Sequence, residues 1–177
     1  MRVVAGTAKG RRLVTPDGRS TRPTSDRVRE SMFNALHSLG AVEDATVLDL
    51  FAGSGALGIE ALSRGAAHCI FVEPAPAALA AIRQNLASAG VAERASIEAR
   101  TAEAYLAAAP APVDVALCDP PYAFAGWTEL LAGLPAGLVV CESDRPVELG
   151  GRWHAARTRR YGGTVVTFAR PAGAHGT

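Results

Sequence analysis

From residue 46 onward the chain alternates short apolar runs with helical patterns, and this alternation constrains the fold more than any other feature. Strands alternating with helices are typical of βαβ units, which build a mostly parallel sheet. We therefore predict an α/β fold. The predicted strands of this part cover residues 46–50, 68–72, 96–99, 113–118 and 137–141. The predicted helices cover residues 56–64, 76–88, 102–108 and 126–132.

The last two apolar runs of the chain have a different connection. Runs 153–160 and 164–169 are separated by a short segment that contains Gly162 and Gly163. A glycine pair between two runs of strand type is typical of a tight hairpin turn. We therefore expect these two strands to be antiparallel to each other.

The N-terminal part has no βαβ pattern. Residues 1–23 hold two short apolar runs around a turn rich in glycine and lysine, which predicts a basic hairpin arm. The remaining residues, 24–177, are predicted to form the main domain. Its first helix is expected to be capped by Thr24 or Ser25 and to end at Gly40.

Length and composition restrict the class of protein. A chain of 177 residues with 49% hydrophobic and 20% charged residues can bury the core of one globular domain. No apolar run is long enough to span a bilayer, and the start has no signal-peptide hydrophobic region, so we expect a cytoplasmic protein without a membrane partner. Cys69, Cys118 and Cys141 have no metal-ligand spacing and are expected to be buried free thiols. The histidines are scattered, so no metal is assigned.

The net charge of +1 conceals an uneven distribution along the chain. Residues 1–30 carry eight cations against three acidic residues, a net charge of +5, which leaves −4 for the remainder. A basic arm on a neutral-to-acidic body suggests a polyanion that contacts mainly the arm. Ordinary solvated surface charge is the alternative. The eight cations are Arg2, Lys9, Arg11, Arg12, Arg19, Arg22, Arg27 and Arg29.

A glycine-rich turn follows the first strand of the alternating part. Gly53, Gly55 and Gly58 satisfy the pattern G-x-G-x-x-G, and Glu73 follows Gly53 by twenty residues. On this pattern alone a nicotinamide dehydrogenase fits. However, Asp49 places a carboxylate just before the turn, where it would repel a pyrophosphate and attract an ammonium group. S-adenosylmethionine has an α-amino group and a sulfonium and no phosphate, so Asp49 favours this cofactor.

A proline corner follows the strand 113–118. Two consecutive prolines, Pro120 and Pro121, cannot donate backbone hydrogen bonds, so they end the strand in a stiff turn. The turn is expected to present the Asp119 carboxylate and the Tyr122 ring at the carboxyl edge of the sheet, where open α/β sheets bind ligands. Carboxylate and carbonyl oxygens accept hydrogen bonds from an amine, and a tyrosine ring stacks on a flat base. A simple strand-ending turn is the alternative.

The two motifs together make the chain resemble a class I S-adenosylmethionine-dependent methyltransferase. More narrowly, it is similar to the RsmD family, bacterial enzymes that methylate the exocyclic N2 of a guanine in 16S ribosomal RNA. The arm and the segment 21–30 point to this family in particular. The resemblance is carried by residues 1–6, 10–13, 21–30, 49–66, 72–73 and 119–122.

The resemblance implies a seven-stranded sheet of order 3-2-1-4-5-7-6 with the last strand antiparallel. It also implies that Glu73 holds the ribose hydroxyls of the cofactor and that Thr101 and Ala102, with Pro74, line the adenine pocket. Many relatives of this fold carry an aspartate where this chain has Thr101. The methionine part of the cofactor would contact Asp49, Phe51, Ala52, Gly53, Ser54 and Gly55.

The implied reaction takes place at the proline corner. Asp119 and the Pro120 carbonyl would accept hydrogen bonds from the guanine 2-amino group, with Pro121 shaping the corner and Tyr122 stacking on the base. The product would be S-adenosylhomocysteine, and the partner would be 16S rRNA in a small ribosomal subunit or an assembly intermediate. We expect a monomer. The residues expected to contact RNA phosphates are Arg11, Arg12, Arg22, Arg27 and Arg29.

Three alternatives remain open from the sequence. For Arg22, Arg27 and Arg29, pairing on a helix surface is the alternative to RNA contact, for instance between Asp26 and Arg29. The proline corner could also serve another planar amine, in DNA or in a protein amide. Finally, the chain could be an RNA-binding module without catalytic activity.

Overall fold

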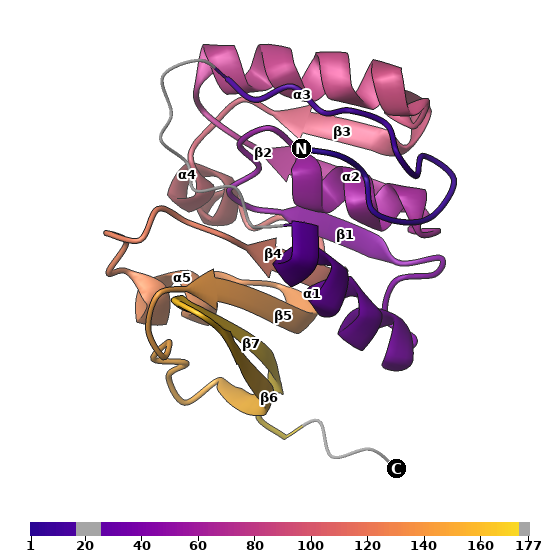
Figure 1. The fold of residues 1–177 in the computed structure, drawn as a ribbon. Coiled ribbons are helices and arrows are strands. Elements are labelled where there is room, and N and C mark those ends of the chain that lie inside the picture. The colour runs from indigo at the N-terminus through magenta and orange to yellow at the C-terminus, as the bar shows by residue number, and fades with distance from the viewer. Residues whose placement is uncertain (17–25, 174–177) are drawn as a thin grey trace.

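A single mixed sheet of seven strands organises the chain, as a computed structural model shows for residues 1–16 and 26–173 (Figure 1). The strand order is β3-β2-β1-β4-β5-β7-β6, and β7 is antiparallel to both of its neighbours. The predicted fold class and strand order are therefore confirmed. The strands are β1 (Thr46–Asp49), β2 (His68–Val72), β3 (Ala95–Glu98), β4 (Val113–Cys118), β5 (Ala136–Ser143), β6 (Trp153–Tyr161) and β7 (Thr164–Pro171).

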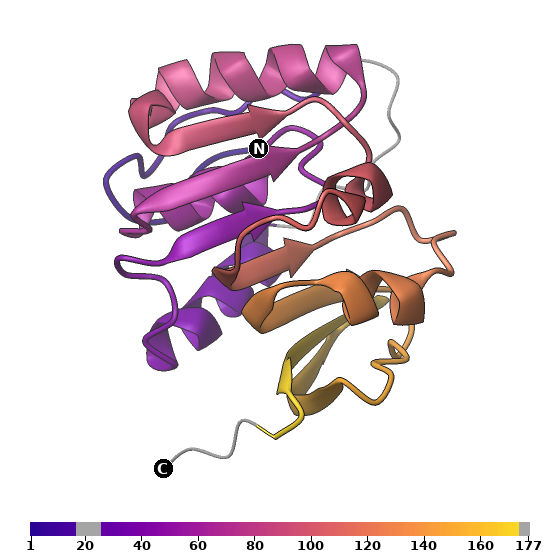
Figure 2. The ribbon, with the colours of Figure 1, turned by 180° about the vertical axis from the view of Figure 1, so that it is seen from behind.

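Helices cover both faces of this sheet (Figures 1 and 2). One apolar cluster joins the first three helices to one face, and a second cluster joins α4 and α5 to the other. A parallel sheet buried on both faces needs this arrangement, because its strands are apolar on both sides. The helices are α1 (Asp26–Ser38), α2 (Ala56–Ser63), α3 (Pro76–Ala89), α4 (Ala102–Ala107) and α5 (Trp127–Gly133), with a short 3-10 turn η1 (Ala92–Arg94).

The parallel register brings the loops after β1 and β4 together. Asp49, the last residue of β1, lies opposite Leu117 of β4, so the corner that begins at Asp119 follows two residues later. Phe71 near the end of β2 lies opposite Asp49 on the other side. The glycine turn and the proline corner therefore share the carboxyl edge of the sheet.

Strand β5 is longer than predicted. The sequence predicts an end at Cys141, because Glu142 and Ser143 are polar. In the structure these two residues remain in the strand, where they pair with Val166 and Val165 of β7. Pairing with a neighbour on the sheet therefore overrides the local polarity of the segment.

The N-terminal arm lies against the domain and contributes to its core. Arg2 and Arg12 form an antiparallel bridge, as the hairpin prediction requires. Val3, Ala8 and Leu13 are buried in the same apolar cluster as α1, α2 and α3. The predicted caps Thr24 and Ser25 and the predicted boundary between residues 23 and 24 lie outside the described residues.

Two further features bear on the class of protein. Cys69, Cys118 and Cys141 are free and buried, as expected. Within residues 1–16 and 26–173, no helix has the length and apolar character that a membrane crossing would require.

Candidate active site

Asp49 is a buried carboxylate with an unsatisfied oxygen. Its side chain is 1% exposed, and Oδ2 accepts a hydrogen bond from the Gly58 backbone N–H at 2.9 Å. Oδ1 has no hydrogen-bond partner among the described residues. Burial raises the pKa of Asp49 from 3.8 to about 7, and the carboxylates of Asp119 and Glu73 add to this rise against the opposing bond from Gly58. A buried acceptor of this kind suits an ammonium group that supplies the missing donor.

The glycine turn next to Asp49 leaves space beside its backbone. Gly53 has φ +55° and no atom within 4 Å of the position that a Cβ would occupy. Gly55 has φ +79°, and a Cβ there would lie 3.3 Å from Ile82. Glycine is needed at both positions because other residues rarely adopt such backbone angles. The open side of Gly53 is where a ligand can approach the main chain.

Three contacts hold this turn in place. The Ala52 backbone N–H donates to the Val72 carbonyl at 3.1 Å, and the Ser54 carbonyl accepts from Asn85 Nδ2 at 2.9 Å. Glu73 Oε2 accepts from the Gly53 backbone N–H at 2.9 Å. These contacts therefore fix the conformation of the turn between β1 and α2.

Glu73 has a structural role in addition to its predicted contact with the ligand. Its other oxygen, Oε1, accepts from the Ala75 backbone N–H at 2.9 Å, and the residue is 2% exposed. A carboxylate offers about four lone-pair sites and can therefore accept several hydrogen bonds at once. Pro74, between these two residues, is exposed.

The predicted adenine contacts lie at the start of α4. The Thr101 hydroxyl accepts a hydrogen bond from the Ala104 backbone N–H at 3.2 Å and thereby caps the helix. Ala102 is buried. Because threonine and aspartate both cap helix N-termini, Thr101 retains the capping function that an aspartate at this position would have.

The proline corner is rigid and faces a small surface hollow. The Phe124 backbone N–H donates to the Pro121 carbonyl at 2.8 Å, and Arg145 Nη2 donates to the Tyr122 carbonyl at 3.0 Å. Pro120 is buried, Pro121 is exposed and Tyr122 is half-buried. The hollow is lined by Pro120, Pro121, Tyr122, Phe124, Trp127, Glu142, Ser143, Asp144 and Arg145.

An aromatic contact joins the two halves of the site. The Phe124 ring lies 5.5 Å from the Phe51 ring of the glycine turn and 5.4 Å from the Trp127 ring, both edge-on. Such edge-to-face pairs are favourable. Asp119 also lies close enough to Asp49 to raise its pKa. The structure therefore brings the predicted cofactor turn and the predicted acceptor corner into one site.

The predicted RNA contacts differ in accessibility. Arg11, Arg12 and Arg27 are exposed, and Arg22 lies outside the described residues. The prediction for Arg29 is wrong, because its side chain is 0% exposed. A cation without solvent access cannot bind an RNA phosphate, so Arg29 has a structural role.

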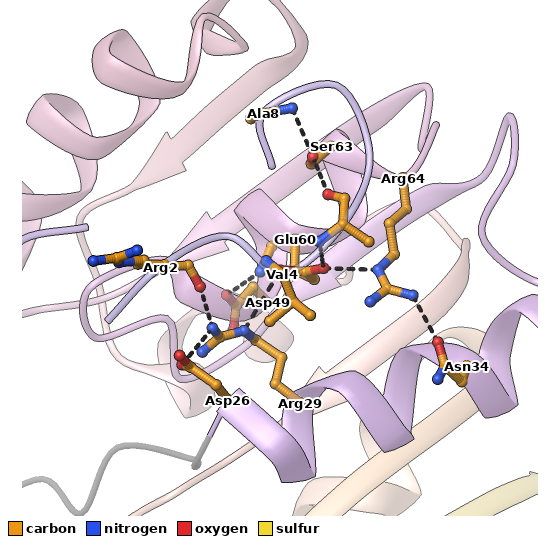
Figure 3. A network of polar contacts seen from close by, with 12 residues as sticks. Arg2, Val4, Ala8, Asp26, Arg29, Asn34, Asp49, Glu60, Ser63 and Arg64 are labelled. Atoms are coloured by element: carbon orange, nitrogen blue, oxygen red, sulfur yellow. Dashed lines mark hydrogen bonds and ion pairs between the residues drawn. The ribbon is translucent and has the colours of Figure 1, made fainter. Parts of the chain in front are cut away.

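Arg29 belongs to a polar network that attaches the arm to α1 and α2 (Figure 3). Its Nη2 donates to Asp26 Oδ1 at 2.9 Å and to the Arg2 carbonyl, and its Nε lies 3.5 Å from Glu60 Oε2. The Asp26–Arg29 pairing considered from the sequence is therefore present. Glu60 also pairs with Arg64 at 2.7 Å.

Glu60 is the centre of this network. Its two carboxylate oxygens accept hydrogen bonds from the Val4 and Ala5 backbone N–H groups at 2.8 and 3.0 Å. Ser63 adds a further link, since its Oγ accepts from the Ala8 backbone N–H at 2.9 Å (Figure 3). One buried carboxylate on α2 thus fixes the path of the arm, which keeps Arg11 and Arg12 on the surface.

Arg29→Ala should destabilise the protein strongly. Removing one partner of a buried ion pair costs about 3–5 kcal/mol, because the remaining charge loses its compensation. Urea unfolding measures this loss directly. Arg27→Ala on the same helix is the matched control, and a surface change of this type is expected to stay within about 0.5 kcal/mol. Equal effects of the two substitutions would contradict the assignment.

Several residues of the site were not predicted from the sequence. Asn85 donates to the carbonyls of both Val14 and Ser54, so it connects the arm to the glycine turn. Its polar side chain on the buried face of α3, beside Ile82 and Leu86, is a signal that sequence reasoning could have used. Phe124, by contrast, gives no signal before its tertiary contacts are known.

The sheet order and the two loops at its carboxyl edge define a class I methyltransferase. Residues 1–170 match the protein family described as "Conserved hypothetical protein 95". The chain belongs to this family, the RsmD family of methyltransferases. This membership excludes the nicotinamide dehydrogenase that the glycine pattern left open.

Individual relatives are similar to this chain over most of its length. It is 39% identical to "Putative rRNA methyltransferase YlbH" of Bacillus subtilis, over 98% of this chain and 100% of that protein. It is 42% identical to "Ribosomal RNA small subunit methyltransferase D" of Escherichia coli, over 69% of this chain and 60% of that protein. The solved structure of "Putative methyltransferase yhhF" from Escherichia coli superimposes with a TM-score of 0.85 at 33% identity and covers 97% of both chains.

Proposed function

We propose that this protein transfers a methyl group from S-adenosylmethionine to the exocyclic N2 of a guanine in 16S rRNA. The observation that carries the proposal is the buried Asp49 carboxylate, whose unpaired oxygen lies at the same sheet edge as the Asp119 corner. The first carboxylate suits a cationic donor, and the second suits an amine acceptor. The names of the Bacillus subtilis and Escherichia coli relatives support rRNA as the substrate.

The residues around Asp49 fit the cofactor. Asp49 Oδ1 would accept from its α-amino group, and the open side of Gly53 would receive the methionine part. Glu73 would hold the ribose hydroxyls, and Pro74, Thr101 and Ala102 would surround the adenine. When bound, S-adenosylmethionine supplies an electrophilic methyl group on a positively charged sulfur.

The proline corner would position the guanine amino group. Asp119 and the Pro120 carbonyl would each accept a hydrogen bond from its two N–H groups, which would turn the nitrogen lone pair out of conjugation and toward the methyl carbon. The corner would thereby hold this nitrogen in line with the methyl group that the cofactor supplies, and the methylated nitrogen would release its extra proton to solvent. Alignment would supply much of the rate. No strong base would be needed, because the amine becomes acidic only after it is methylated. Tyr122 would stack on the base, as in other enzymes that act on a base taken out of its stack.

Binding of a guanine in the hollow at the corner would require a movement of its side chains. The hollow beside Pro120 and Tyr122 encloses only about 10 Å³, room for roughly one water. A guanine is far larger, so Tyr122 or Phe124 would move when the base binds. Arg145 Nη2 donates to the Tyr122 carbonyl and not to its side chain, so this hydrogen bond does not fix the ring.

A labelled-methyl assay tests the proposed function. The protein is incubated with labelled S-adenosylmethionine and with either naked 16S rRNA or unmodified small subunits, and the labelled nucleotide is mapped. Label at N2 of one guanine is the expected result. Label on DNA or on a protein amide would contradict the proposed substrate, and binding of RNA without transfer would identify a non-catalytic module.

The arm is proposed to contact RNA phosphates through Arg11 and Arg12. The double substitution Arg11→Ala with Arg12→Ala should weaken RNA binding and reduce the slope of log K against log salt by about 0.7 to 0.9 for each lost phosphate contact. Titration of RNA at several salt concentrations measures the slope. An unchanged slope would show that the arm does not contact the RNA.

We also propose where the protein acts. It would act in the cytoplasm, as a monomer on the small ribosomal subunit or on its assembly intermediate.

A further inference from the structure

The C-terminal part of the chain carries a second basic segment. Residues 149–177 contain five arginines and no aspartate or glutamate, whereas residues 31–148 contain five cations and fourteen acidic residues. The cationic charge of the protein is therefore concentrated at both ends of the sequence. The five arginines are Arg152, Arg157, Arg159, Arg160 and Arg170.

Three of these arginines are exposed on the edge strand β6. Arg157, Arg159 and Arg160 are all exposed, and no ion pair between residues of the described part of the chain involves them. β6 is the terminal strand of the sheet, and seven of its nine residues are exposed. These three cations are therefore accessible to a polyanion.

The register of the sheet places this strand near the proline corner. Arg159 lies opposite Val166, which in turn lies opposite Glu142 of β5. Arg160 is aligned through Val165 with Ser143 in the same way. Glu142 and Ser143 both line the hollow at the corner. Two strand spacings separate β6 from β5, about 10 Å.

Two of the arginines share a sheet face with the first helix. Arg157 and Arg159 lie opposite Phe168 and Val166, which belong to the apolar cluster that α1 covers. Directly opposed residues of an antiparallel pair project from the same face of a sheet. The three arginines are thus distributed over both faces of the strand, because Arg160 alternates with Arg159.

The orientation of α1 adds a further cation to this edge. The C-terminal end of α1 lies with the first residues of β4 and β5, since Leu39 shares a hollow with Val113 and Gly137. The N-terminal turn, which carries the exposed Arg27, therefore points toward the carboxyl edge (Figure 1). Arg27 and Arg159 lie toward the same edge on the same face.

We propose that Arg157, Arg159 and Arg160 of β6 form a second RNA-binding surface, which holds the phosphates that flank the target guanine on the side opposite the N-terminal arm. The inference rests on the proposed function, because it takes RNA as the substrate. The arm packs on α2 and α3, whereas β6 closes the other end of the sheet (Figures 1 and 2). The substrate would be held on both sides of the acceptor corner. Phosphate contacts of this kind position an RNA without reading its sequence.

Edge protection is the competing explanation for these charges. Exposed edge strands commonly carry charged residues and bulges that prevent pairing with another chain, and β6 has a register shift between Ala155 and Arg157. Protection alone does not require that every charge on the strand is positive. Since β6 has arginines and no acidic residue, its charge complements a polyanion.

The test compares two triple substitutions with a distant control. Arg157→Ala, Arg159→Ala and Arg160→Ala are combined in one variant, and the same positions are changed to lysine in a second. Arg83→Ala, an exposed arginine on α3, is the control for a general loss of charge. The probe is unmodified 16S rRNA, and the measurements are its binding as a function of salt, kcat and KM for methyl transfer, and sedimentation of the free protein.

We expect the alanine variant to lower the salt slope by about 2 and to raise KM for RNA by roughly tenfold or more, with kcat unchanged. The lysine variant should retain binding, because a phosphate contact needs the charge. An unchanged slope in the alanine variant, an equal loss in Arg83→Ala, or an equal loss in the lysine variant would overturn the inference. A wild-type dimer that the alanine variant dissociates would also overturn it in favour of pairing between copies.

A failure of the β6 surface can be distinguished from a failure of the proposed function. If the wild-type protein transfers methyl to guanine N2 and the β6 variants behave like wild type, only the second surface is disproved. If the wild-type protein transfers no methyl group to 16S rRNA, the proposed function fails first. The salt slope then still shows whether β6 contacts RNA.

Discussion

Asp119→Ala is expected to reduce kcat for methyl transfer by at least about 100-fold. The reason is that the carboxylate is proposed to hold the amino group in line with the methyl carbon, and a reacting group displaced by about 1 Å costs this much rate. Cofactor affinity should change little, because Asp119 does not belong to the glycine turn. Single-turnover methyl transfer and calorimetric titration of the cofactor measure the two quantities separately.

Asp119→Asn is the matched variant for this test. It keeps one acceptor oxygen of similar shape and removes the charge, so we expect an activity between wild type and Asp119→Ala. Removing this charge should also lower the pKa of Asp49, which the Asp119 carboxylate helps to raise. Loss of cofactor binding together with transfer in both variants would contradict the assigned role.

Asp49→Asn is expected to weaken cofactor binding by about 2–5 kcal/mol, equivalent to at least about 30-fold in Kd. The substitution removes the charge that would meet the α-amino group in a buried environment. Calorimetric titration with S-adenosylhomocysteine, which retains this amino group, measures the loss. Glu129→Gln, at an exposed position on α5, removes one negative charge elsewhere and should leave Kd unchanged.

The raised pKa of Asp49 predicts a pH dependence of cofactor binding. The protein must release the Asp49 proton to bind a cation there, so affinity should increase with pH up to about 7 and level off above it. Below pH 7 the expected change is about tenfold per pH unit for one proton. Asp49→Asn should abolish this dependence. A pH-independent Kd in the wild-type protein would show that Asp49 does not bind the cation.

The same group affects the stability of the cofactor-free protein in the opposite sense. The pKa of Asp49 is about 7 in the folded state and 3.8 in the unfolded state, so the folded state binds more protons between these values. Its contribution to stability is complete below about pH 4 and is lost as the pH rises toward 7. Urea unfolding should therefore show Asp49→Asn to be more stable than wild type at pH 8, by an amount on the order of a few kcal/mol.

A higher stability of Asp49→Asn would show that the Asp49 carboxylate lowers the free energy of unfolding of the free protein. A buried carboxylate with an unpaired oxygen is unfavourable in the free protein and becomes favourable when a donor binds. Hydrogen bonds from Gly58 to Asp49 and from Gly53 to Glu73 hold both carboxylates in place meanwhile. Together with the Asn85 contact, they fix the conformation of the glycine turn.

The sequence predicted the helices, the strands and the positions of both motifs well, because each of them depends on a short continuous segment. Strand β2 and strand β4 have the predicted ends, because each is an apolar run bounded by residues that break strands. The glycine turn and the proline corner each follow their strand directly. Because parallel strands share a carboxyl edge, their meeting at one site could be inferred without coordinates.

What the sequence by itself determined was the fold class and the positions of the glycine turn and the proline corner, since each depends on short segments whose chemistry is local. Only the tertiary structure decided which charges are buried and which face solvent. Arg29 and Arg27 lie on the same helix, yet one is enclosed by Glu60, Asp26 and the arm. Likewise β6 is aligned with the end of β5 only through its pairing with β7. Contacts between segments that are distant in the chain leave no local pattern, and these contacts set burial and charge pairing.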